Sequence, residues 1–478
     1  MIQKRTKILA TLGPASCSPK IIEGLIKAGV NLFRLNFSHG THEHHLETLH
    51  MIRKAMKKLN TTIGVMQDIS GPKVRVGDIE EKFELKIGDI ITFKQKPIVG
   101  YRKAEGQFVV SINYPKILKK IKVGESVYLY DGMIRAKVIS AGKSVKIMIE
   151  NDGILSSKKG VNFPNTEIGI DILTQKDRDD IAWGVKHRVD FFAISFVQNA
   201  DDITRVRELL NGYGGKIISK IEKFDAIENI DEIIKVSDGI MVARGDLGIE
   251  VPYYEVPTLQ KMLIRKANEN SIPVITATQM LLSMTTNRSA TRAEVSDVAN
   301  AVLDGTDIVM LSEESAIGDD PVNVVKTMSK IIAQTEKIYP YSKQRTIGLL
   351  GKFDIIEQSV MNIADELNAT GILILTSSGQ SAVKISRFRP KTKVYAFTHH
   401  KEVLTQLTSI WGVTPIDQIS IVSASKMIKG MLTKLEKRGI LDKKGLYIST
   451  IGYPLGVPGS TNTIKILNES EIDYYLNM

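Results

Sequence analysis

Short β-rich runs alternate with amphipathic stretches along the first two-thirds of the chain, giving about eight β/α units. The β-rich runs are TKILATLG, NLFRLNF, TIGVMQDI, VDFFAISF, KIISKIE, SDGIMVA, IPVITATQ and TDIVMLS. Ser18, Asp201 and Thr291 stand where helix caps are expected. Eight units are the number at which a parallel sheet closes on itself, so the pattern predicts an α/β chain built on a TIM (β/α)8 barrel.

The alternation is interrupted once and restarts once. Between about Lys73 and Pro164 helical periodicity disappears and β-type runs follow one another, which predicts an antiparallel β-barrel lid domain inserted after the third strand. From about Tyr341 the alternation restarts, which predicts a separate C-terminal α/β domain. The predicted boundaries are 1–71 and 167–340 for the two parts of the barrel, 72–166 for the lid and 341–478 for the C-terminal domain.

Composition narrows the functional classes. The chain is 43% hydrophobic and 24% charged, as globular proteins are. No run approaches the roughly 18 apolar residues of a membrane helix, and the single Cys17 permits no internal disulfide, so we expect a cytoplasmic protein without membrane partners. The formal net charge of +11 suits anionic partners, but no Lys/Arg block is interleaved with aromatic residues, so nucleic acid is not an expected partner.

Polar residues occupy the carboxyl ends of seven consecutive predicted barrel strands. They are Arg34, Asn36 and Ser38; Asp68; Ser195; Lys220 and Glu222; Arg244, Gly245 and Asp246; Thr278 and Gln279; and Ser312 and Glu314. The carboxyl ends of all strands of a TIM barrel open on one face, where the active sites of such enzymes lie. We therefore expect these side chains to share one rim.

The residue types at this rim point to phosphoryl transfer. Glu222 and Asp246 supply the carboxylate oxygens that a hard divalent cation prefers. Lys220 can hold a phosphoryl group as a point charge, and Arg34 and Arg75 add cations for oxyanions. Positioning and charge neutralisation supply most of the rate in phosphoryl transfer.

Seven motifs occur in an order that resembles the pyruvate kinase family: TLGPAS, RLNFSHGTHE, QDISGPKVR, SKIE, VARGDLG, TATQM and TRAEVSDVANAVLDG. The resemblance covers essentially the whole chain, including KKGVNFP in the insertion. It implies transfer of the phosphoryl group of phosphoenolpyruvate to ADP, giving ATP and pyruvate, by an enzyme that is usually a homotetramer.

The resemblance also implies roles for single residues. Glu222 and Asp246 match the ligands of Mg²⁺ or Mn²⁺, Lys220 matches the lysine that stabilises the transferring phosphoryl group, and Arg34 matches the arginine that binds substrate phosphate. The residues that match the group holding the substrate carboxylate are Gly245, Asp246 and Thr278. Those that match the polar line protonating the enol of pyruvate are Thr278 and Ser312, and those that match nucleotide contacts are His39, Arg75 and Lys159.

The stretch QDISGPK departs from the family's potassium-dependent members. Asn36, Ser38 and Asp68 match side-chain ligands of the monovalent site, but Ile69 stands where those members have threonine and Lys73 where they have glutamate. A fixed ammonium can supply the charge that K⁺ supplies. The resemblance is therefore to the potassium-independent branch, and we expect no requirement for K⁺.

Two further stretches bear on the site and on regulation. Glu313 stands where the family usually has glycine, which leaves the backbone conformation beside Ser312 open. LTSSGQSAVKIS places a hydroxyl-rich turn between a strand and a helix, and the family's matching loop binds the phosphate of an activator. Its candidate residues for a sugar phosphate or AMP are Thr376, Ser377, Ser378, Gly379 and Ser381, with the late loop GYPLGVPGSTN facing them.

Two other functional classes are compatible with part of this pattern. A metal-dependent barrel lyase or aldolase acting on pyruvate-like acids would share Glu222, Asp246 and an enolate intermediate, but it would not need Lys159 or a C-terminal domain. A non-catalytic scaffold on the same fold would not need the set Lys220, Glu222 and Asp246. An assay with phosphoenolpyruvate and ADP separates the three.

Overall fold

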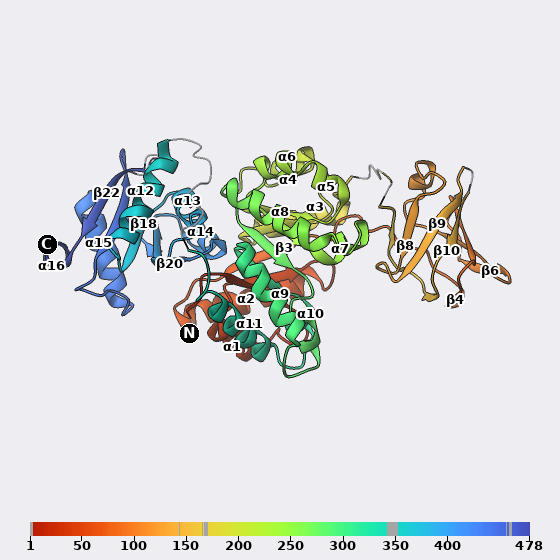
Figure 1. Cartoon of the computed structure of the whole chain (residues 1–478), viewed down its shortest axis with the longest axis horizontal. Coiled ribbons are helices and arrows are strands. Elements are labelled where there is room, and N and C mark those ends of the chain that lie inside the picture. The colour runs from red at the N-terminus through yellow and green to blue at the C-terminus, as the bar shows by residue number, and fades with distance from the viewer. Residues whose placement is uncertain are drawn as a thin grey trace.

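The computed structural model describes residues 3–142, 144–164, 166, 171–341, 352–455, 457 and 461–478. These residues form a central barrel, with an inserted domain on one side and a C-terminal domain on the other (Figure 1). The predicted boundaries between 166 and 167 and between 340 and 341 fall beside residues outside the described ranges, so they stay predictions.

Eight parallel strands close the barrel in the order β1-β17-β16-β15-β14-β13-β3-β2. Their bounds are β1 (Lys7–Leu12), β2 (Leu32–Asn36), β3 (Gly64–Asp68), β13 (Phe191–Ile194), β14 (Lys216–Ile221), β15 (Gly239–Ala243), β16 (Val274–Ala277) and β17 (Ile308–Leu311). Each predicted β-rich run supplies one strand, so the predicted TIM barrel is confirmed.

Helices surround the strands. They are α1 (Pro19–Ala28), α2 (His42–Leu59), α3 (Gln175–Lys186), α4 (Ala200–Leu209), α5 (Phe224–Glu228), α6 (Ile230–Val236), α7 (Arg244–Glu250), α8 (Val256–Glu269), α9 (Arg292–Asp304), α10 (Glu313–Ala316) and α11 (Pro321–Thr335), with a 3-10 turn at Leu282–Thr285.

Two of the three predicted helix caps are confirmed. Ser18 accepts a hydrogen bond from the Ile21 N–H, and Thr291 forms a capping box at the start of α9. The expected cap at Asp201 is wrong, because Asn199 caps α4 in a reciprocal box with Asp202. An Asn two residues earlier offers the same acceptor and lets the helix begin at Ala200.

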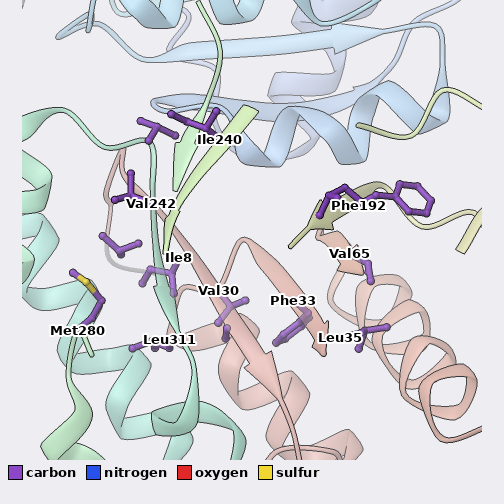
Figure 2. Packing of buried hydrophobic residues seen from close by; sticks show 14 of the residues in the cluster. Ile8, Val30, Phe33, Leu35, Val65, Phe192, Ile240, Val242, Met280 and Leu311 are labelled. Atoms are coloured by element: carbon purple, nitrogen blue, oxygen red, sulfur yellow. The ribbon is translucent and has the colours of Figure 1, made fainter. Parts of the chain in front are cut away.

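Alternation along the strands divides the barrel's apolar residues between two layers. Leu9, Leu32 and Met66 belong to a cluster inside the barrel, whereas Ile8 and Phe33, their neighbours in sequence, pack between the strands and the helices (Figure 2). The strands are therefore buried on both faces.

The inserted domain has its own core. Its strands are β4 (Phe83–Leu85), β5 (Ile90–Lys94), β6 (Tyr101–Ala104), β7 (Gln107–Ser111), β8 (Ser126–Leu129), β9 (Ile134–Ser140), β10 (Val145–Ile149), β11 (Gly153–Leu155) and β12 (Val161–Asn162), with a 3-10 turn at Pro115–Lys119. Seven of them form one sheet in the order β12-β8-β9-β10-β5-β7-β6. The sheet is antiparallel except for β5 and β7, because β7 lies between β5 and its own hairpin partner β6.

The chain enters and leaves the inserted domain through a paired neck, residues 74–76 and 159–161. The Val161 N–H donates to the Val74 carbonyl (2.9 Å), and the Val76 N–H donates to the Lys159 carbonyl (2.9 Å). The two crossings are thus held side by side.

The C-terminal domain is a five-stranded sheet in the order β20-β19-β18-β21-β22, with only β22 antiparallel. Its elements are α12 (Lys352–Glu366), β18 (Gly371–Leu375), α13 (Gln380–Arg387), β19 (Val394–Thr398), α14 (Lys401–Gln406), a 3-10 turn at Leu407–Ser409, β20 (Val413–Gln418), α15 (Ala424–Lys437), β21 (Tyr447–Gly452), β22 (Thr461–Leu467) and α16 (Glu469–Asn477). Residues of α12 and α13 share one buried cluster, and those of α15 and α16 share another with residues from the opposite side of the strands.

This domain meets the barrel at the amino ends of its strands. Lys7 at the start of β1 donates to the Val413 carbonyl (2.6 Å), and buried Arg389 contacts Asp307, which precedes β17 (2.7 Å). The carboxyl ends of the barrel strands lie at the other end of the barrel. Among the described residues, no helix combines the length and the apolarity that crossing a membrane requires.

Candidate active site

Lys220 lies at the centre of a polar network on the carboxyl-end rim of the barrel. Its Nζ lies 3.2 Å from Asp68 Oδ1, 2.9 Å from Glu222 Oε1 and 2.7 Å from Ser195 Oγ. Asp68 Oδ2 accepts from Arg34 Nε at 2.6 Å. Side chains from β2, β3 and β14 and from the loop after β13 therefore meet at one place, as expected of the strand ends.

Opposite charges determine the ionisation of this network. Burial raises the pKa of Asp68, but the cations Arg34 and Lys220 outweigh it and hold that pKa below its usual value. Burial lowers the pKa of Lys220, but Asp68 and Glu222 outweigh it and hold that pKa above its usual value. The Lys220 ammonium and the Asp68 carboxylate are therefore both charged at neutral pH.

Glu222 is the least solvated carboxylate of the network, with 1% of its surface exposed. Burial raises its pKa to about 7; Lys220 opposes this and the negative charge of Asp246 adds to it. Its Oε2 is held by the Phe196 N–H at 2.8 Å. A cation bound beside Glu222 would offset the repulsion that the charge of Asp246 exerts on it.

Glu222 and half-buried Asp246, in the first turn of α7, fit a magnesium ion. Mg²⁺ takes one or two carboxylates and keeps its other positions for water and substrate oxygens. Within the described ranges no three His, Cys, Asp or Glu side chains gather into a complete metal cage. The pair thus suits an ion that is completed by substrate rather than a structural metal.

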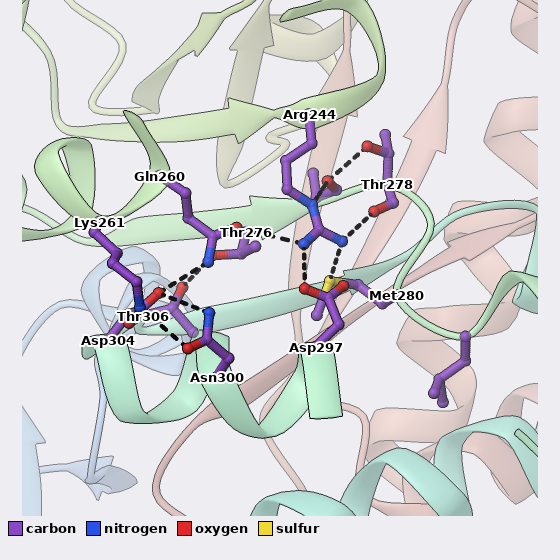
Figure 3. A network of polar contacts seen from close by, with 12 residues as sticks. Arg244, Gln260, Lys261, Thr276, Thr278, Met280, Asp297, Asn300, Asp304 and Thr306 are labelled. Atoms are coloured by element: carbon purple, nitrogen blue, oxygen red, sulfur yellow. Dashed lines mark hydrogen bonds and ion pairs between the residues drawn. The ribbon is translucent and has the colours of Figure 1, made fainter. Parts of the chain in front are cut away.

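Thr278 follows β16 in a constrained backbone. Thr278 and Gln279 have φ of 70° and 55°, in the left-handed region that costs a β-branched residue about 1–3 kcal/mol. The Gly245 N–H donates to Thr278 Oγ1 at 2.9 Å, and Arg244 donates to the Thr278 carbonyl at 2.6 Å and to Asp297 at 2.7 Å (Figure 3). These contacts hold the hydroxyl beside the start of α7.

Ser312 and Glu314 follow β17. Buried Glu314 accepts from the Ser312 N–H (2.7 Å) and from the Leu281 N–H (3.1 Å), which ties together the loops after β16 and β17. Glu313 begins α10 without a positive φ, so this position does not need the glycine that the family usually has. Its side chain is exposed.

The predicted nucleotide contacts lie on different domains. In the inserted domain Arg75 donates to the Lys158 carbonyl (2.9 Å), and the Lys159 ammonium lies 3.8 Å from the centre of the Tyr130 ring. His39, on the barrel, is exposed. Among the described residues, no hydrogen bond or ion pair joins the side chains of His39, Arg75 and Lys159.

The residues of the predicted monovalent site are also divided. Asn36 accepts from the Ser38 N–H (3.1 Å), and the Ile69 carbonyl accepts from Ser195 Oγ (2.7 Å), both beside Asp68 on the rim. The Lys73 ammonium instead lies 3.3 Å from Asp131 of the inserted domain. The structure thus places Lys73 at the neck rather than against Asp68.

The predicted phosphate loop connects β18 to α13. Thr376 is buried and accepts from the Gly379 N–H (2.9 Å), Gly379 has a φ of 88°, and Ser381 bonds Thr461 at 2.9 Å. No side chain caps the eight-residue helix that follows. In the late loop that was expected to face it, 456 and 458–460 lie outside the described residues.

Sequence reasoning named Ser195 and Arg244 as strand-end residues but assigned them no task. In the structure Ser195 links Lys220 to the Ile69 carbonyl, and Arg244 holds the loop that carries Thr278. Thr11, which accepts from Arg34 at 3.1 Å, was not singled out. The only signal available for it was its place near the end of the first strand.

Comparison with known proteins gives matches over almost the whole chain. The family model described as the pyruvate kinase barrel domain matches residues 3–325, and the model of the pyruvate kinase alpha/beta domain matches residues 354–467. Pyruvate kinase 2 of Synechocystis sp. is 40% identical over 473 residues, covering 97% of this chain and 79% of the relative. Pyruvate kinase of Clostridium acetobutylicum is 39% identical over 472 residues, covering 97% and 99%.

A solved structure shows the same arrangement. The crystal structure of a pyruvate kinase from Cryptosporidium parvum superposes with a TM-score of 0.91 at 34% sequence identity. The match covers 97% of this chain and 96% of that one.

Proposed function

The chain belongs to the pyruvate kinase family, and from that premise we propose that its barrel rim transfers the phosphoryl group of phosphoenolpyruvate to ADP with Mg²⁺ or Mn²⁺ and without a requirement for K⁺. The observation that carries this proposal is the network in which Lys220 and Arg34 face the buried acids Asp68 and Glu222. Two cations fixed at one rim, with a metal-binding pair beside them, suit a phosphoryl group with charge on three oxygens.

The rim residues divide the work of the reaction. Lys220 and Arg34 bind the oxygens of the transferring phosphoryl group, and their contacts to Asp68 keep both heads in place before substrate arrives. The Gly245 N–H and the Thr278 hydroxyl hold the carboxylate of phosphoenolpyruvate, and Thr278 with Ser312 delivers the proton that converts the enol to pyruvate.

Glu222 and Asp246 would hold the divalent ion, which when bound neutralises phosphate charge and brings the two substrates together. Arg75 and Lys159 would approach the ADP phosphates as the inserted domain closes over the rim and excludes water. Until the inserted domain closes over the rim, the cation–π contact with Tyr130 holds the Lys159 ammonium within the inserted domain.

A lactate-dehydrogenase-coupled assay with phosphoenolpyruvate, ADP and Mg²⁺ tests the activity. We expect pyruvate formation that requires ADP, that stops when EDTA removes the metal, and that is lost in E222Q. Pyruvate release without ADP, or carbon–carbon cleavage of a pyruvate-like acid, would favour the barrel lyase instead.

Potassium independence rests on Lys73. In this proposal, closing of the inserted domain breaks the ion pair of Lys73 with Asp131 and moves the Lys73 ammonium to the side of the rim where Asp68 lies. We expect equal activity with and without K⁺ in the wild type, and a loss of potassium-free activity in K73A. K158A is the matched control, because Lys158 also pairs with an aspartate of the inserted domain at 3.3 Å. Strong stimulation of the wild type by K⁺, or full potassium-free activity in K73A, would contradict the proposal.

Regulation and assembly follow the family by resemblance. The loop from Thr376 to Ser381 offers hydroxyls and uncapped helix N–H groups to an effector phosphate. Titrating a sugar phosphate and AMP separately at subsaturating phosphoenolpyruvate tests this effector site, and no response to either would contradict it.

We also propose that the protein is a cytoplasmic homotetramer. Light scattering gives the mass of the assembly, and the lone Cys17 accords with a reducing compartment.

A further inference from the structure

Helix α15 carries a row of cations on the side that faces away from the sheet. Lys426, Lys429, Lys434 and Lys437 recur at intervals of three to five residues, and Arg438 caps the helix end. The residues of α15 that pack against the sheet are Met427, Ile428, Met431, Leu432 and Leu435. The helix is therefore amphipathic in the usual way, but its polar face is almost entirely basic.

These cations line a groove of about 550 Å³. Asp417 of β20 and Asn60, which caps the carboxyl end of α2 in the barrel, complete its walls, together with small residues of α15. A volume of about 300–1,000 Å³ is typical of small-molecule sites. The groove lies on the α15 side of the sheet, whereas the Thr376–Ser381 loop begins α13 on the other side.

Most of the positive charge in the groove is uncompensated. Lys434 pairs with Asp417 at 2.7 Å and the charge of Arg438 also acts on that carboxylate, whereas Lys426, Lys429 and Lys437 form no ion pair with any residue that the structure describes. The one acid on this part of the helix, Glu436, pairs with Lys443 instead.

Helix stability explains only part of this arrangement, because Lys434 and Lys437 stand in the last turn of α15, where the helix dipole favours cations. Lys426 stands in the first turn of α15, where the helix dipole disfavours a cation. Lys426 with Lys429, and Lys434 with Lys437, place like charges three residues apart, which disfavours the helix. Lys426 and the two like-charged pairs are therefore not explained by helix stability, and the groove beside them offers ligand binding as their role.

We propose that this groove binds a small, multiply phosphorylated anion, such as a sugar bisphosphate or an inorganic oligophosphate. Two or more phosphate groups match a row of cations that extends over several helical turns. None of the residues lining the groove is aromatic, so a nucleobase would find no stacking partner there. The occupant expected is a phosphate-rich molecule without a base, bound separately from the rim and from the Thr376–Ser381 loop.

Titration calorimetry of the full chain with inorganic tripolyphosphate, without divalent metal, tests the proposal. We expect K429Q/K437Q to weaken one binding event by about tenfold or more. The matched control is K326Q/K330Q, which removes the same charge from the exposed side of α11 and leaves that binding event unchanged. Equal thermal midpoints show that both variants stay folded.

Several outcomes would overturn the proposal. Equal tripolyphosphate affinity in the wild type and in K429Q/K437Q would show that the anion does not bind in this groove. Loss of binding in S378A/S381A but not in K429Q/K437Q would place the anion at the Thr376–Ser381 loop. Tighter binding of mixed-sequence duplex DNA or of phosphatidylserine vesicles than of tripolyphosphate would indicate that the basic face of α15 binds a nucleic acid or a membrane instead.

A hexose bisphosphate that competes with tripolyphosphate in the wild type, but not in K429Q/K437Q, would support a sugar bisphosphate as the ligand.

Discussion

Replacement of Arg389 by methionine should loosen the junction between the C-terminal domain and the barrel. Arg389 is 1% exposed and Asp307 is 5% exposed, and their Nη1 and Oδ1 atoms lie 2.7 Å apart. The second guanidinium nitrogen donates to the Asn268 side chain and to the Gly305 carbonyl, both at 2.6 Å, and the guanidinium lies 4.9 Å from the centre of the Trp411 ring. Asp307, Asn268 and Gly305 of the barrel thus all contact one arginine of the C-terminal domain.

The expected cost follows from what R389M leaves behind. The Asp307 carboxyl group would remain buried without its arginine partner, with the Val274 N–H as a remaining donor (2.9 Å). Removing one partner of a buried ion pair costs about 3–5 kcal/mol. D307N alone strands the arginine and should cost a similar amount, whereas R389M/D307N removes both charges. The double variant should therefore be more stable than the sum of the single changes predicts, by about 2 kcal/mol or more.

Because the chain has only two tryptophans, tryptophan fluorescence can report on unfolding at the junction. In a W183F background the fluorescence of Trp411, at the junction, is the only tryptophan signal. Urea unfolding of the four variants in that background gives the coupling energy. A cost below about 1 kcal/mol for R389M, or additivity within about 0.5 kcal/mol, would refute the view that this pair fastens the two domains.

Three further predictions concern the rim and the folding of the barrel. K220M should lower kcat in the coupled assay by about 10³-fold, because it removes the fixed charge beside the phosphoryl group, and an unchanged near-UV spectrum would separate this effect from unfolding. E314A should cost about 2–5 kcal/mol in urea unfolding, because the Ser312 and Leu281 N–H groups lose their acceptor; a cost below 1 kcal/mol would disprove that role. Burial raises the pKa of Asp190 to about 6, so its contribution to stability is present at pH 4 and is lost as pH rises through 6. The stability of D190N relative to wild type should rise by about 2–3 kcal/mol between pH 4 and pH 7, and a constant difference would contradict this.

The architecture was predictable because its signals are local. Alternation, turn residues and the interruption after Asp68 determined the barrel and the insertion, since each depends on neighbours in sequence. The parallel pairing of β5 with β7 was not predictable, because it depends on where the β6 hairpin folds back over the sheet. The cap of α4 was misplaced by two residues because both Asn and Asp can serve.

The rim was predictable as a set of strand ends, but its internal contacts were not. Spacing along one strand places Lys220 and Glu222 together, whereas the bond from Lys220 to Ser195 joins different strands. Lys73 shows the same limit. Its sequence position is close to Asp68, but its partner Asp131 is about sixty residues away, and only the folded insertion brings the two together. Arg389 gave no sequence signal because its partners lie in another domain.

Because the neck is paired, the inserted domain can be deleted from the chain without separating the barrel segments on either side of it. Because residues 74–76 and 159–161 run alongside each other, a short turn joining the two crossings would replace the whole insertion without stretching the barrel. The insertion keeps a hydrophobic core of its own, so excising it exposes little that the barrel had buried. Such a barrel should still close and retain the Lys220 network while losing Arg75 and Lys159. If the roles proposed above for Lys220, Arg75 and Lys159 hold, such a barrel would separate the binding of the phosphoryl group from its delivery to ADP.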